Sequence, residues 1–272
     1  MAAQNNVNQL SSALREAGER RIQSERIVGV VVAIGAMLLE SGAEVYRVEE
    51  TMNRLGKAVP GVDDCISYVT VTGIMCSIIS KGETVTRIAR IGSGSRNIAV
   101  INAINNLSRQ AEKKHYGAAY LEQELEKIKA LPKYSLTQKT FFAAIGAAGF
   151  AVFFNGDWKE IAGSFLIGLA VQLLYNYLSN LTLNMFFANA LSAFATAVLS
   201  FLFHRFVPLA SINILIISVI MLLVPGLALT NALRDTMMGE YLSGVARTTE
   251  AMLIAVSIAL GVGLGLYACT FI

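Results

Sequence analysis

The sequence predicts a membrane α-helical bundle of about five transmembrane helices, preceded by a small cytoplasmic α+β domain. Of the 41 charged residues, 31 lie in residues 1–136 and only 10 in residues 137–272. The second half also holds five long apolar runs, and the chain has 54% hydrophobic residues and a mean hydropathy of +0.55. A polar half followed by an apolar half indicates a soluble domain joined to a membrane domain.

The boundaries of these parts follow from composition. Residues 1–19 predict a flexible N-terminus, residues 20–135 the cytoplasmic α+β domain, and residues 136–272 a five-span transmembrane domain. The apolar run Ile27–Leu39 is too short to span a bilayer, which favours a helix in a soluble core or on the membrane surface. Ser41-Gly42 then turns the chain into a second helix, Ala43–Ala58. Apolar residues at steps of three and four predict its buried face: Val45, Val48, Met52, Leu55 and Val59.

The rest of the first half predicts strands and then helices. Residues 65–91 are rich in β-branched residues and bounded by glycines, which indicates about three antiparallel strands with a tight turn at Lys81-Gly82. Ser95 is expected to cap a helix from Arg96 to about Lys114. A charged helix over Tyr116–Leu131 ends at Pro132.

Each of the five apolar runs approaches the roughly 20 residues that a bilayer span needs. They lie at residues 136–154, 161–177, 181–203, 209–230 and 249–271. Four lysines crowd the entrance to the first run: Lys127, Lys129, Lys133 and Lys139. The positive-inside rule therefore predicts a multi-pass protein of the cytoplasmic (inner) membrane with its N-terminal domain in the cytoplasm.

The stretch Leu222–Gly244 interrupts the fourth run. Proline lacks the N–H that a helix needs, so Pro225 and Gly226 predict a break inside the span. Four polar residues follow: Thr230, Asn231, Arg234 and Asp235. Broken spans that end in polar groups form the sites of many secondary transporters, so these six residues are candidates for substrate binding or gating. The alternative is a kinked structural helix followed by a solvated loop.

Two further sets of residues stand out in the spans. Asn176 and Asn184 belong to a row of amides at four-residue steps, with Gln172 and Asn180. Such a row fits either interhelical hydrogen bonding or a polar path for substrate. The last span carries a face of small residues at four-residue steps, Ser257, Gly261 and Gly265. This face fits subunit packing and internal packing equally well.

The sequence predicts no catalytic residues, no metal site and no cofactor. Cys65, Cys76 and Cys269 form no CxxC pair and are expected to be reduced and buried. Neither histidine, His115 or His204, lies in a nucleophile motif. A net charge of +3 is too weak to indicate nucleic acid as a partner. Without a nucleotide-binding signature, transport needs a gradient or another subunit as its driving force.

Two stretches of the sequence, one in each half, carry distinctive motifs. The first is M-L-L-E-S-G-A-E-V-Y-R-V-E-E-T-M-N-R, Met37–Arg54, with the strand Y-V-T-V-T-G-I after it. The second is L-V-P-G-L-A-L-T-N-A-L-R-D with the downstream G-E-Y-L-S-G. Together these stretches resemble the threonine/serine exporter family. The matching positions are Glu40, Ser41, Gly42, Arg47, Glu49 and Arg54 in the first stretch, and Pro225, Gly226, Asn231, Arg234, Asp235 and Gly244 in the second. The resemblance covers most of the chain after about residue 25.

Members of that family are either fused or split into a long and a short membrane protein, and this chain resembles the long partner. The resemblance implies a hetero-oligomer with a short membrane subunit in the lipid bilayer. Its small-molecule substrate would be threonine or serine, or a C4 dicarboxylate such as succinate. Arg234 or the N-terminal end of a half-helix is expected to meet the substrate carboxylate. Asp235 and Glu240 are candidates for carrying a coupling proton, although Asp235 could instead pair with Arg234.

Two other functions remain open at this point. The chain could be a membrane-anchored regulatory or scaffold subunit without its own transport path. It could also be a membrane-tethered hydrolase, although no residue pattern supports the catalysis. Efflux assays with and without the short partner separate the first of these from an exporter subunit.

Overall fold

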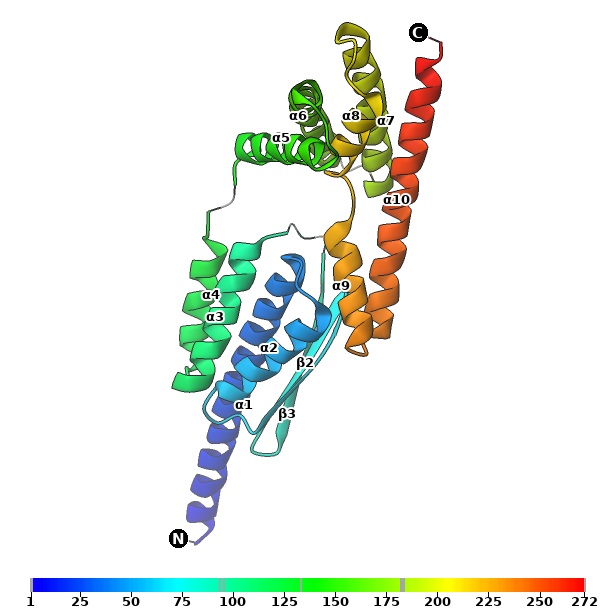
Figure 1. The fold of residues 1–272 in the computed structure, drawn as a ribbon. Coiled ribbons are helices and arrows are strands. Elements are labelled where there is room, and N and C mark those ends of the chain that lie inside the picture. Colours follow the sequence, from blue (N-terminus) through cyan, green and yellow to red (C-terminus); the bar gives the residue numbers. More distant parts are fainter. Residues whose placement is uncertain (1, 93, 95, 133, 182–183, 272) are drawn as a thin grey trace. The chain divides into compact units, whose positions relative to one another are not determined.

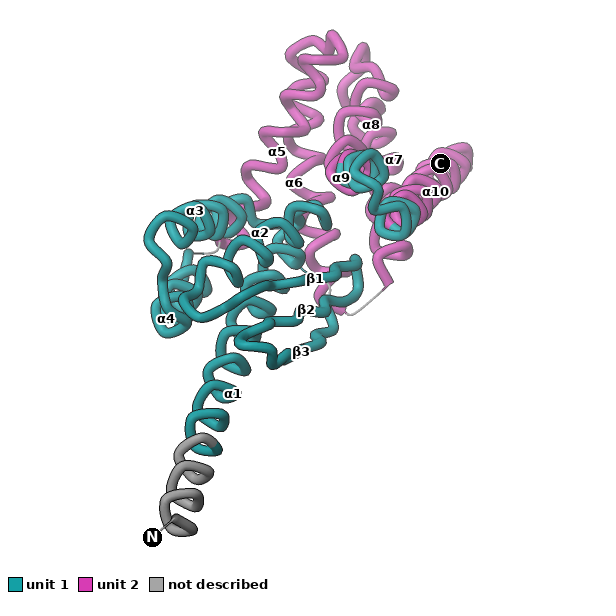
Figure 2. The backbone as a smooth tube through the Cα atoms, turned by 90° about the horizontal axis from the view of Figure 1, so that it is seen from below, with its two compact units in different colours: residues 1–132, 231–246 teal, residues 133–230, 247–272 magenta. Residues whose placement is uncertain are grey.

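The structure, a computed structural model, describes residues 2–92, 94, 96–132, 134–181 and 184–271, with side chains from residue 14 onward. It contains two compact units (Figure 2). Unit 1 comprises residues 1–132 and 231–246, and unit 2 comprises residues 133–230 and 247–272. The first boundary lies near the predicted one at residue 135. The segment Asn231–Ala246, which the sequence assigned to the membrane domain, belongs instead to unit 1.

The predicted fold class is confirmed. Helices dominate, and a small three-stranded antiparallel sheet lies near the N-terminus. Within the described residues, five helices are long and apolar enough to cross a membrane: Leu14–Glu40, Leu136–Phe153, Trp158–Asn180, Met185–Phe206 and Tyr241–Cys269. This set differs from the predicted runs because it includes the first helix and omits the run at residues 209–230.

Unit 1 combines the sheet with four helices of the N-terminal half (Figure 1). In chain order these elements are α1 (Ala2–Glu40), α2 (Val45–Ala58), β1 (Asp64–Thr70), β2 (Gly73–Ser80), β3 (Glu83–Arg90), α3 (Ile98–Lys114) and α4 (Ala118–Lys129). The strands pair in the order β1-β2-β3, and the register places Tyr68 opposite Met75 and Met75 opposite Ile88. The helix α2 packs against β1, whereas α1 packs against β2 and β3. The turn between β2 and β3 is the predicted pair Lys81-Gly82, both with positive φ, as a two-residue hairpin requires.

The core of unit 1 lies between the sheet and the helices α1 and α2. The predicted apolar face of α2 is confirmed, since Val45, Val48, Met52 and Leu55 are fully buried and Val59 nearly so. Most of the run Ile27–Leu39 in α1 is buried in the same core. Of the two alternatives for that run, the structure therefore favours the buried helix, packed in the core of unit 1. Cys65, Cys76 and Cys269 are free and buried, as expected.

Two boundaries in unit 1 differ from the expectations. The helix α1 runs back to Ala2, through the residues expected to be flexible. Pairs of opposite charge one turn apart, Glu16 with Arg20 and Arg21 with Glu25, stabilise this part of α1. The helix α3 begins at Ile98 rather than Arg96, because the side chain of Asn97 accepts hydrogen bonds from the N–H groups of Ala99 and Val100. The expected cap, Ser95, lies outside the described residues.

Unit 2 is helical. Its elements are α5 (Leu136–Phe153), α6 (Trp158–Asn180), α7 (Met185–Phe206), α8 (Ile212–Ile220), the start of α9 (Gly226–Met237) and most of α10 (Tyr241–Cys269). The predicted fourth run is not one helix, because α8 has nine residues and the chain turns before Pro225. Nine helical residues extend about 14 Å, less than half the hydrocarbon thickness of a bilayer.

The small-residue face of α10 packs against α7 inside unit 2. A Cβ added at Gly261 would lie 2.2 Å from the carbonyl oxygen of Ala190, and one at Gly265 would lie 2.7 Å from the Cβ of Ala197. Ser257 is fully buried on the same face. Of the two alternatives that the sequence left open, the structure contains the internal contact.

We expect Val48→Asp to destabilise unit 1 by about 3 kcal/mol or more, because it places an unpaired charge in a fully buried position. Thermal unfolding of the purified full chain in detergent measures the effect. Val48→Ala, which removes only methyl groups, should cost clearly less. Equal melting temperatures for Val48→Asp and the unmodified chain would contradict the assignment of this face to the core.

Candidate functional site

The first of the two family-like stretches, Met37–Arg54, is called the first motif here, and it contains the turn between α1 and α2. The N–H of Ala43 donates to the carbonyl of Leu38 at 3.1 Å, and the N–H of Gly42 donates to the carbonyl of Leu39 at 3.0 Å. This pair of bonds is the Schellman motif, which requires a left-handed residue after the helix. Gly42 supplies it with φ +91°. The turn leaves the carbonyl of Gly42 and the start of α2 available for contacts from elsewhere.

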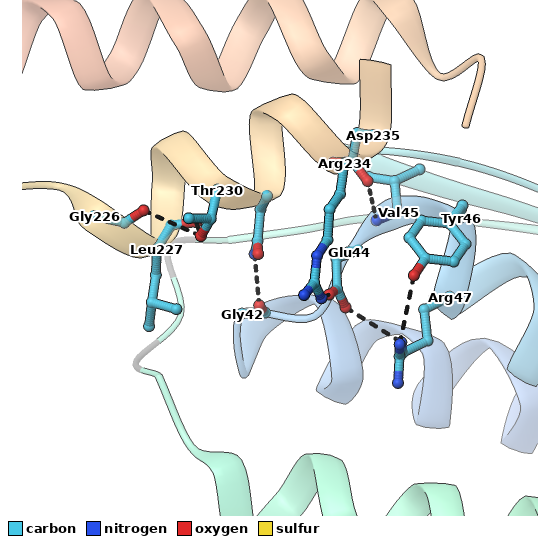
Figure 3. A network of polar contacts seen from close by, with 11 residues as sticks. Gly42, Glu44, Val45, Tyr46, Arg47, Gly226, Leu227, Thr230, Arg234 and Asp235 are labelled. Carbon is cyan, nitrogen blue, oxygen red and sulfur yellow. Dashed lines mark hydrogen bonds and ion pairs between the residues drawn. The ribbon is translucent and has the colours of Figure 1, made fainter. Parts of the chain in front are cut away.

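The second motif is the other family-like stretch, and its polar residues contact this turn within unit 1. Asn231, Arg234 and Asp235 are three and four residues apart, so they share one face of α9. The amide of Asn231 donates to the carbonyl of Gly42 at 2.9 Å. The guanidinium of Arg234 donates to Oε1 of Glu44 at 2.5 Å. Figure 3 shows the contact between Arg234 and Glu44 together with that of Asp235. We call the turn Gly42–Val45 and its partners Asn231, Arg234 and Asp235 the motif junction.

Asp235 caps the helix α2. Its Oδ1 accepts a hydrogen bond from the N–H of Val45, the first residue of α2, at 3.0 Å (Figure 3). The residue at the N-cap position, Glu44, makes no capping bond with its own side chain. Asp235 is fully buried, and a carboxylate at a helix N-terminus is stabilised by the free N–H groups and the helix dipole. A residue of α9 therefore completes a helix 190 positions earlier in the chain.

Glu44 lies between two arginines. One oxygen accepts from Arg234, and the other lies 3.3 Å from Nε of Arg47. Burial opposes ionisation of Glu44, but a backbone hydrogen bond and the guanidinium groups of Arg234 and Arg47 outweigh it, so the pKa of Glu44 lies below its usual value. Arg234 keeps 59% of its side chain exposed, whereas Glu44 keeps 11%. The arginine is thus the side of this pair that a dissolved anion can reach.

Glu49 ties α2 to the sheet. Its Oε1 accepts from the N–H of Val69 in β1 at 2.7 Å. Burial, together with the carboxylate of Glu240 nearby in unit 1, raises the pKa of Glu49 in spite of that hydrogen bond. The pKa values of Glu44 and Glu49 are therefore shifted in opposite directions, since a backbone hydrogen bond and two arginines lower the pKa of Glu44 whereas burial and Glu240 raise that of Glu49.

The ion pair of Glu44 predicts a pH dependence of stability. Because the folded pKa of Glu44 lies below its unfolded value of about 4.3, its contribution is present above that pH and is lost as the pH falls through the folded pKa. Glu44→Gln should lower the melting temperature of the full chain at pH 7, and the difference from the unmodified chain should shrink below pH 4.3, to about zero once the carboxyl is protonated. Glu112→Gln, at an exposed carboxylate 3.7 Å from Arg54, is the control and should change little at either pH. A Glu44→Gln effect that is independent of pH would contradict the ionic contribution.

The other residues of the first motif have varied positions. Arg47 also donates to the hydroxyl of Tyr46 at 3.4 Å. Arg54 pairs with Glu50 on the outside of α2. Glu40 is exposed at the end of α1. Ser41 is buried, and its carbonyl accepts from the N–H of Asn97 at 3.1 Å.

The candidates at the start of α9 make local contacts. Pro225 stands directly before α9, and its carbonyl accepts from the N–H of Leu229 at 3.0 Å. Gly226 is the first helical residue. The hydroxyl of Thr230 donates to the carbonyls of Gly226 and Leu227, each at 3.1 Å (Figure 3). These residues belong to unit 2, whereas the polar face that follows them belongs to unit 1.

Asn176 and Asn184 lie in unit 2 and also have local partners. The amide of Gln172 donates to Asn176 at 3.3 Å, one turn apart on α6. Asn184 caps α7 by accepting from the N–H of Phe186 at 3.1 Å. The row of amides that the sequence suggested is therefore divided between a pair on one helix and a cap on the next.

Sequence reasoning missed two carboxylates. Glu44 lies inside the first motif, between residues that were singled out, and the available signal was a carboxylate in the first turn of the predicted helix Ala43–Ala58. Glu160 is buried near the start of α6, although the sequence placed it just outside the second apolar run. A charged residue directly beside an apolar run was the available signal, but it is also typical of an ordinary loop.

Comparison with known proteins gives one family and several relatives. The family model described as "Putative threonine/serine exporter" matches residues 29–268. A "Probable succinate transporter subunit YjjP" of Klebsiella aerogenes is 25% identical over 241 residues, covering 88% of this chain and 93% of the relative. The protein of that name from Escherichia coli K12 is 25% identical over 245 residues, covering 90% and 95%. A "Probable threonine/serine exporter" of Mycobacterium tuberculosis is 23% identical over 258 residues, covering 92% of this chain and 47% of the relative. No solved structure matches.

Proposed function

Because the chain belongs to the threonine/serine exporter family, we propose that it is one subunit of a secondary exporter for a small carboxylate-bearing metabolite. The family is one of membrane transporters with several spans, not of enzymes. The proposal goes further in naming the substrate class, the partner and the residues that act. The motif junction carries it, because that junction unites the two stretches that resemble the family.

The substrate class is supported by the names of the relatives. They are described as transporters of succinate or exporters of threonine and serine, and these three molecules share a carboxylate. Arginine is the side chain best suited to a carboxylate, because its planar guanidinium donates two parallel hydrogen bonds. Arg234 is the candidate, since more than half of its side chain is exposed beside the partner that it already holds.

The proposed mechanism is competition for Arg234. In the structure Arg234 is paired with Glu44 at the start of α2. A substrate carboxylate that binds Arg234 displaces Glu44 and weakens the hold of α9 on the turn Gly42–Val45. Asn231 and Asp235 keep their own contacts with that turn, so the segment loosens without detaching. The pair thus acts as a gate that opens when substrate is present.

The partner is proposed to be a short membrane subunit of the same family. Two relatives of about this length are described as subunits, and this chain covers 47% of the threonine/serine exporter from Mycobacterium tuberculosis. A second, shorter chain would supply what the longer relative holds in one protein. The lysines before α5 support a cytoplasmic position for the N-terminal domain. A reporter fused to the N-terminus, active on one side of the membrane only, tests that position.

Reconstitution into liposomes tests the function. The chain, its short partner and both together are assayed for efflux of labelled serine, threonine and succinate. We expect efflux of at least one of them only when both chains are present. Full efflux from the partner alone would make this chain a regulatory or scaffold subunit. Absence of efflux for all three substrates from the complete complex would overturn the proposed function.

A further inference from the structure

Glu160 is a buried carboxylate in unit 2, the unit that contains α5–α8 and most of α10. It is the third residue of α6 and is 4% exposed. The other charged side chains that the structure describes in unit 2 are partly or fully exposed. An ionisable group inside a span is expensive to keep there, which makes it a candidate for function rather than for stability.

One oxygen of Glu160 has a structural role. Oε1 accepts a hydrogen bond from the N–H of Ser211, at the N-cap of α8, at 2.6 Å. The carbonyl of the same peptide group, that of Ala210, accepts from Nδ1 of His204 at 2.6 Å. Since a carbonyl only accepts, Nδ1 of His204 carries the proton. A single peptide group therefore links exposed His204 to buried Glu160.

The second oxygen of Glu160 is not explained by that role. Oε2 is buried and has no hydrogen-bond partner among the described residues. Capping α8 needs one acceptor, which a glutamine or an asparagine supplies equally well. A buried anion with an unsatisfied oxygen is costly, whereas the protonated acid removes the charge. The geometry thus favours a carboxyl group that binds a proton at Oε2.

Three buried hydroxyl groups lie on α6, α7 and α8, one on each helix. A Cβ at Gly163 would be 2.7 Å from both Phe203 of α7 and Leu215 of α8, so α6, α7 and α8 meet at this level. Ser164 follows Gly163 on α6. Ser200 lies three residues from Phe203 on α7, and Ser218 lies three residues from Leu215 on α8. In both cases the serine is about 4.5 Å further along the helix, away from the end near Glu160. All three serines are fully buried, and their hydroxyls have no partner among the described residues. The three serines thus lie on the inner side of Glu160, on helices that pack together, and a hydroxyl group can both donate and accept a hydrogen bond.

We infer that Glu160 is the proton-binding site through which the membrane unit couples export to a proton gradient. In the step, a lone pair on Oε2 takes a proton from a hydronium ion on the side of His204, leaving water and a neutral carboxylic acid. Release of that proton toward the other side restores the carboxylate. The charged and titratable groups at this end are Asp157 and Lys159 on α6 and its N-cap, and His204 and Arg205 on α7. The described residues of the adjoining ends of α5 and α8 contribute none.

The role in coupling rests on the proposed function, but the proton site itself does not, so the test has two parts. In the first, the full chain in lipid vesicles is titrated by infrared spectroscopy. All carboxyl groups of the chain contribute a carbonyl band as the pH is lowered, so the spectrum of Glu160→Gln, which keeps an acceptor for Ser211, is subtracted from that of the unmodified chain at each pH. The difference should contain one carbonyl band of a protonated carboxylic acid, that of Glu160. Asp157→Asn, at an exposed carboxylate of the same helix end, is the matched control and should retain the band. Identical titrations of Glu160→Gln and the unmodified chain would overturn the inference.

In the second part, the complex with the short partner is assayed in liposomes with an imposed pH gradient. The unmodified complex should accelerate efflux in response to the gradient. Glu160→Gln should still exchange labelled for unlabelled substrate but lose that response completely. An equal response in both would overturn the coupling role. If the unmodified complex moves no substrate at all, the proposed function fails, while the infrared result still decides whether Glu160 binds a proton.

Discussion

Replacing Arg234 by alanine is expected to abolish export while the chain remains in the membrane. The change removes the guanidinium that holds Glu44 and, in the proposed mechanism, the substrate carboxylate. One hydrogen bond to a charged group contributes about 2 kcal/mol, which corresponds to roughly a thirty-fold change in an equilibrium constant. Efflux per molecule of membrane-inserted protein measures the effect separately from expression. Arg234→Lys keeps the charge but loses the planar fork, so export should be weakened rather than lost.

The matched control is Arg54→Ala. Arg54 is also an arginine of unit 1, but it pairs with Glu50 and Glu112 on the outside of α2. Its loss should leave export nearly unchanged, because exposed ion pairs contribute little to stability. Equal loss of export in Arg54→Ala and Arg234→Ala would mean that the assay reports general damage to unit 1 rather than the motif junction.

Glu44→Gln separates a gate from a structural tie. If substrate competes with Glu44 for Arg234, removing the negative charge of Glu44 should lower the substrate concentration that gives half-maximal efflux. If the pair only holds unit 1 together, the same change should reduce the amount of folded protein and leave that concentration unaltered. Unchanged half-saturation in Glu44→Gln, combined with normal export by Arg234→Lys, would remove the pair from the mechanism.

The second large effect is expected at Gly261. Leucine at this position would place its Cβ 2.2 Å from the carbonyl oxygen of Ala190, so α10 has to move away from α7. A clash with backbone is not relieved by a change of rotamer, and we expect a loss of about 3 kcal/mol or more and little folded unit 2. Gly263→Leu is the control, because a Cβ at Gly263 meets nothing within 4 Å. Melting of the purified chain, with its yield from membranes, compares the two variants.

The sequence also allowed this face to bind another subunit, and the same pair of variants tests that alternative. A Gly261→Leu chain that melts normally but no longer co-purifies with the short partner would show that the face serves an interface. Loss of folded chain before any partner is added supports the internal contact.

The sequence by itself determined the features that depend on neighbouring residues. The buried face of α2 follows from apolar residues at steps of three and four, because a helix repeats every 3.6 residues. The hairpin at Lys81-Gly82 follows from the backbone angles that a two-residue turn requires. The break before α9 follows from the missing N–H of Pro225. The division into a charged half and an apolar half predicted the fold class, because composition is a local property that does not depend on which distant residues are in contact.

Only the tertiary structure decided which distant residues meet and what covers each apolar surface. Hydropathy does not distinguish a helix in a protein core from one that lies on the membrane surface, so the run Ile27–Leu39 left the burial of α1 against β2 and β3 open. The role of Asp235 as a cap for α2 depends on a contact across 190 residues, and no local pattern encodes it. In the sequence Glu160 likewise resembles a loop residue, and only its contact with the N-terminus of α8 shows otherwise. These contacts are set by the packing of complete helices, and packing depends on every surface at once rather than on the spacing within one segment.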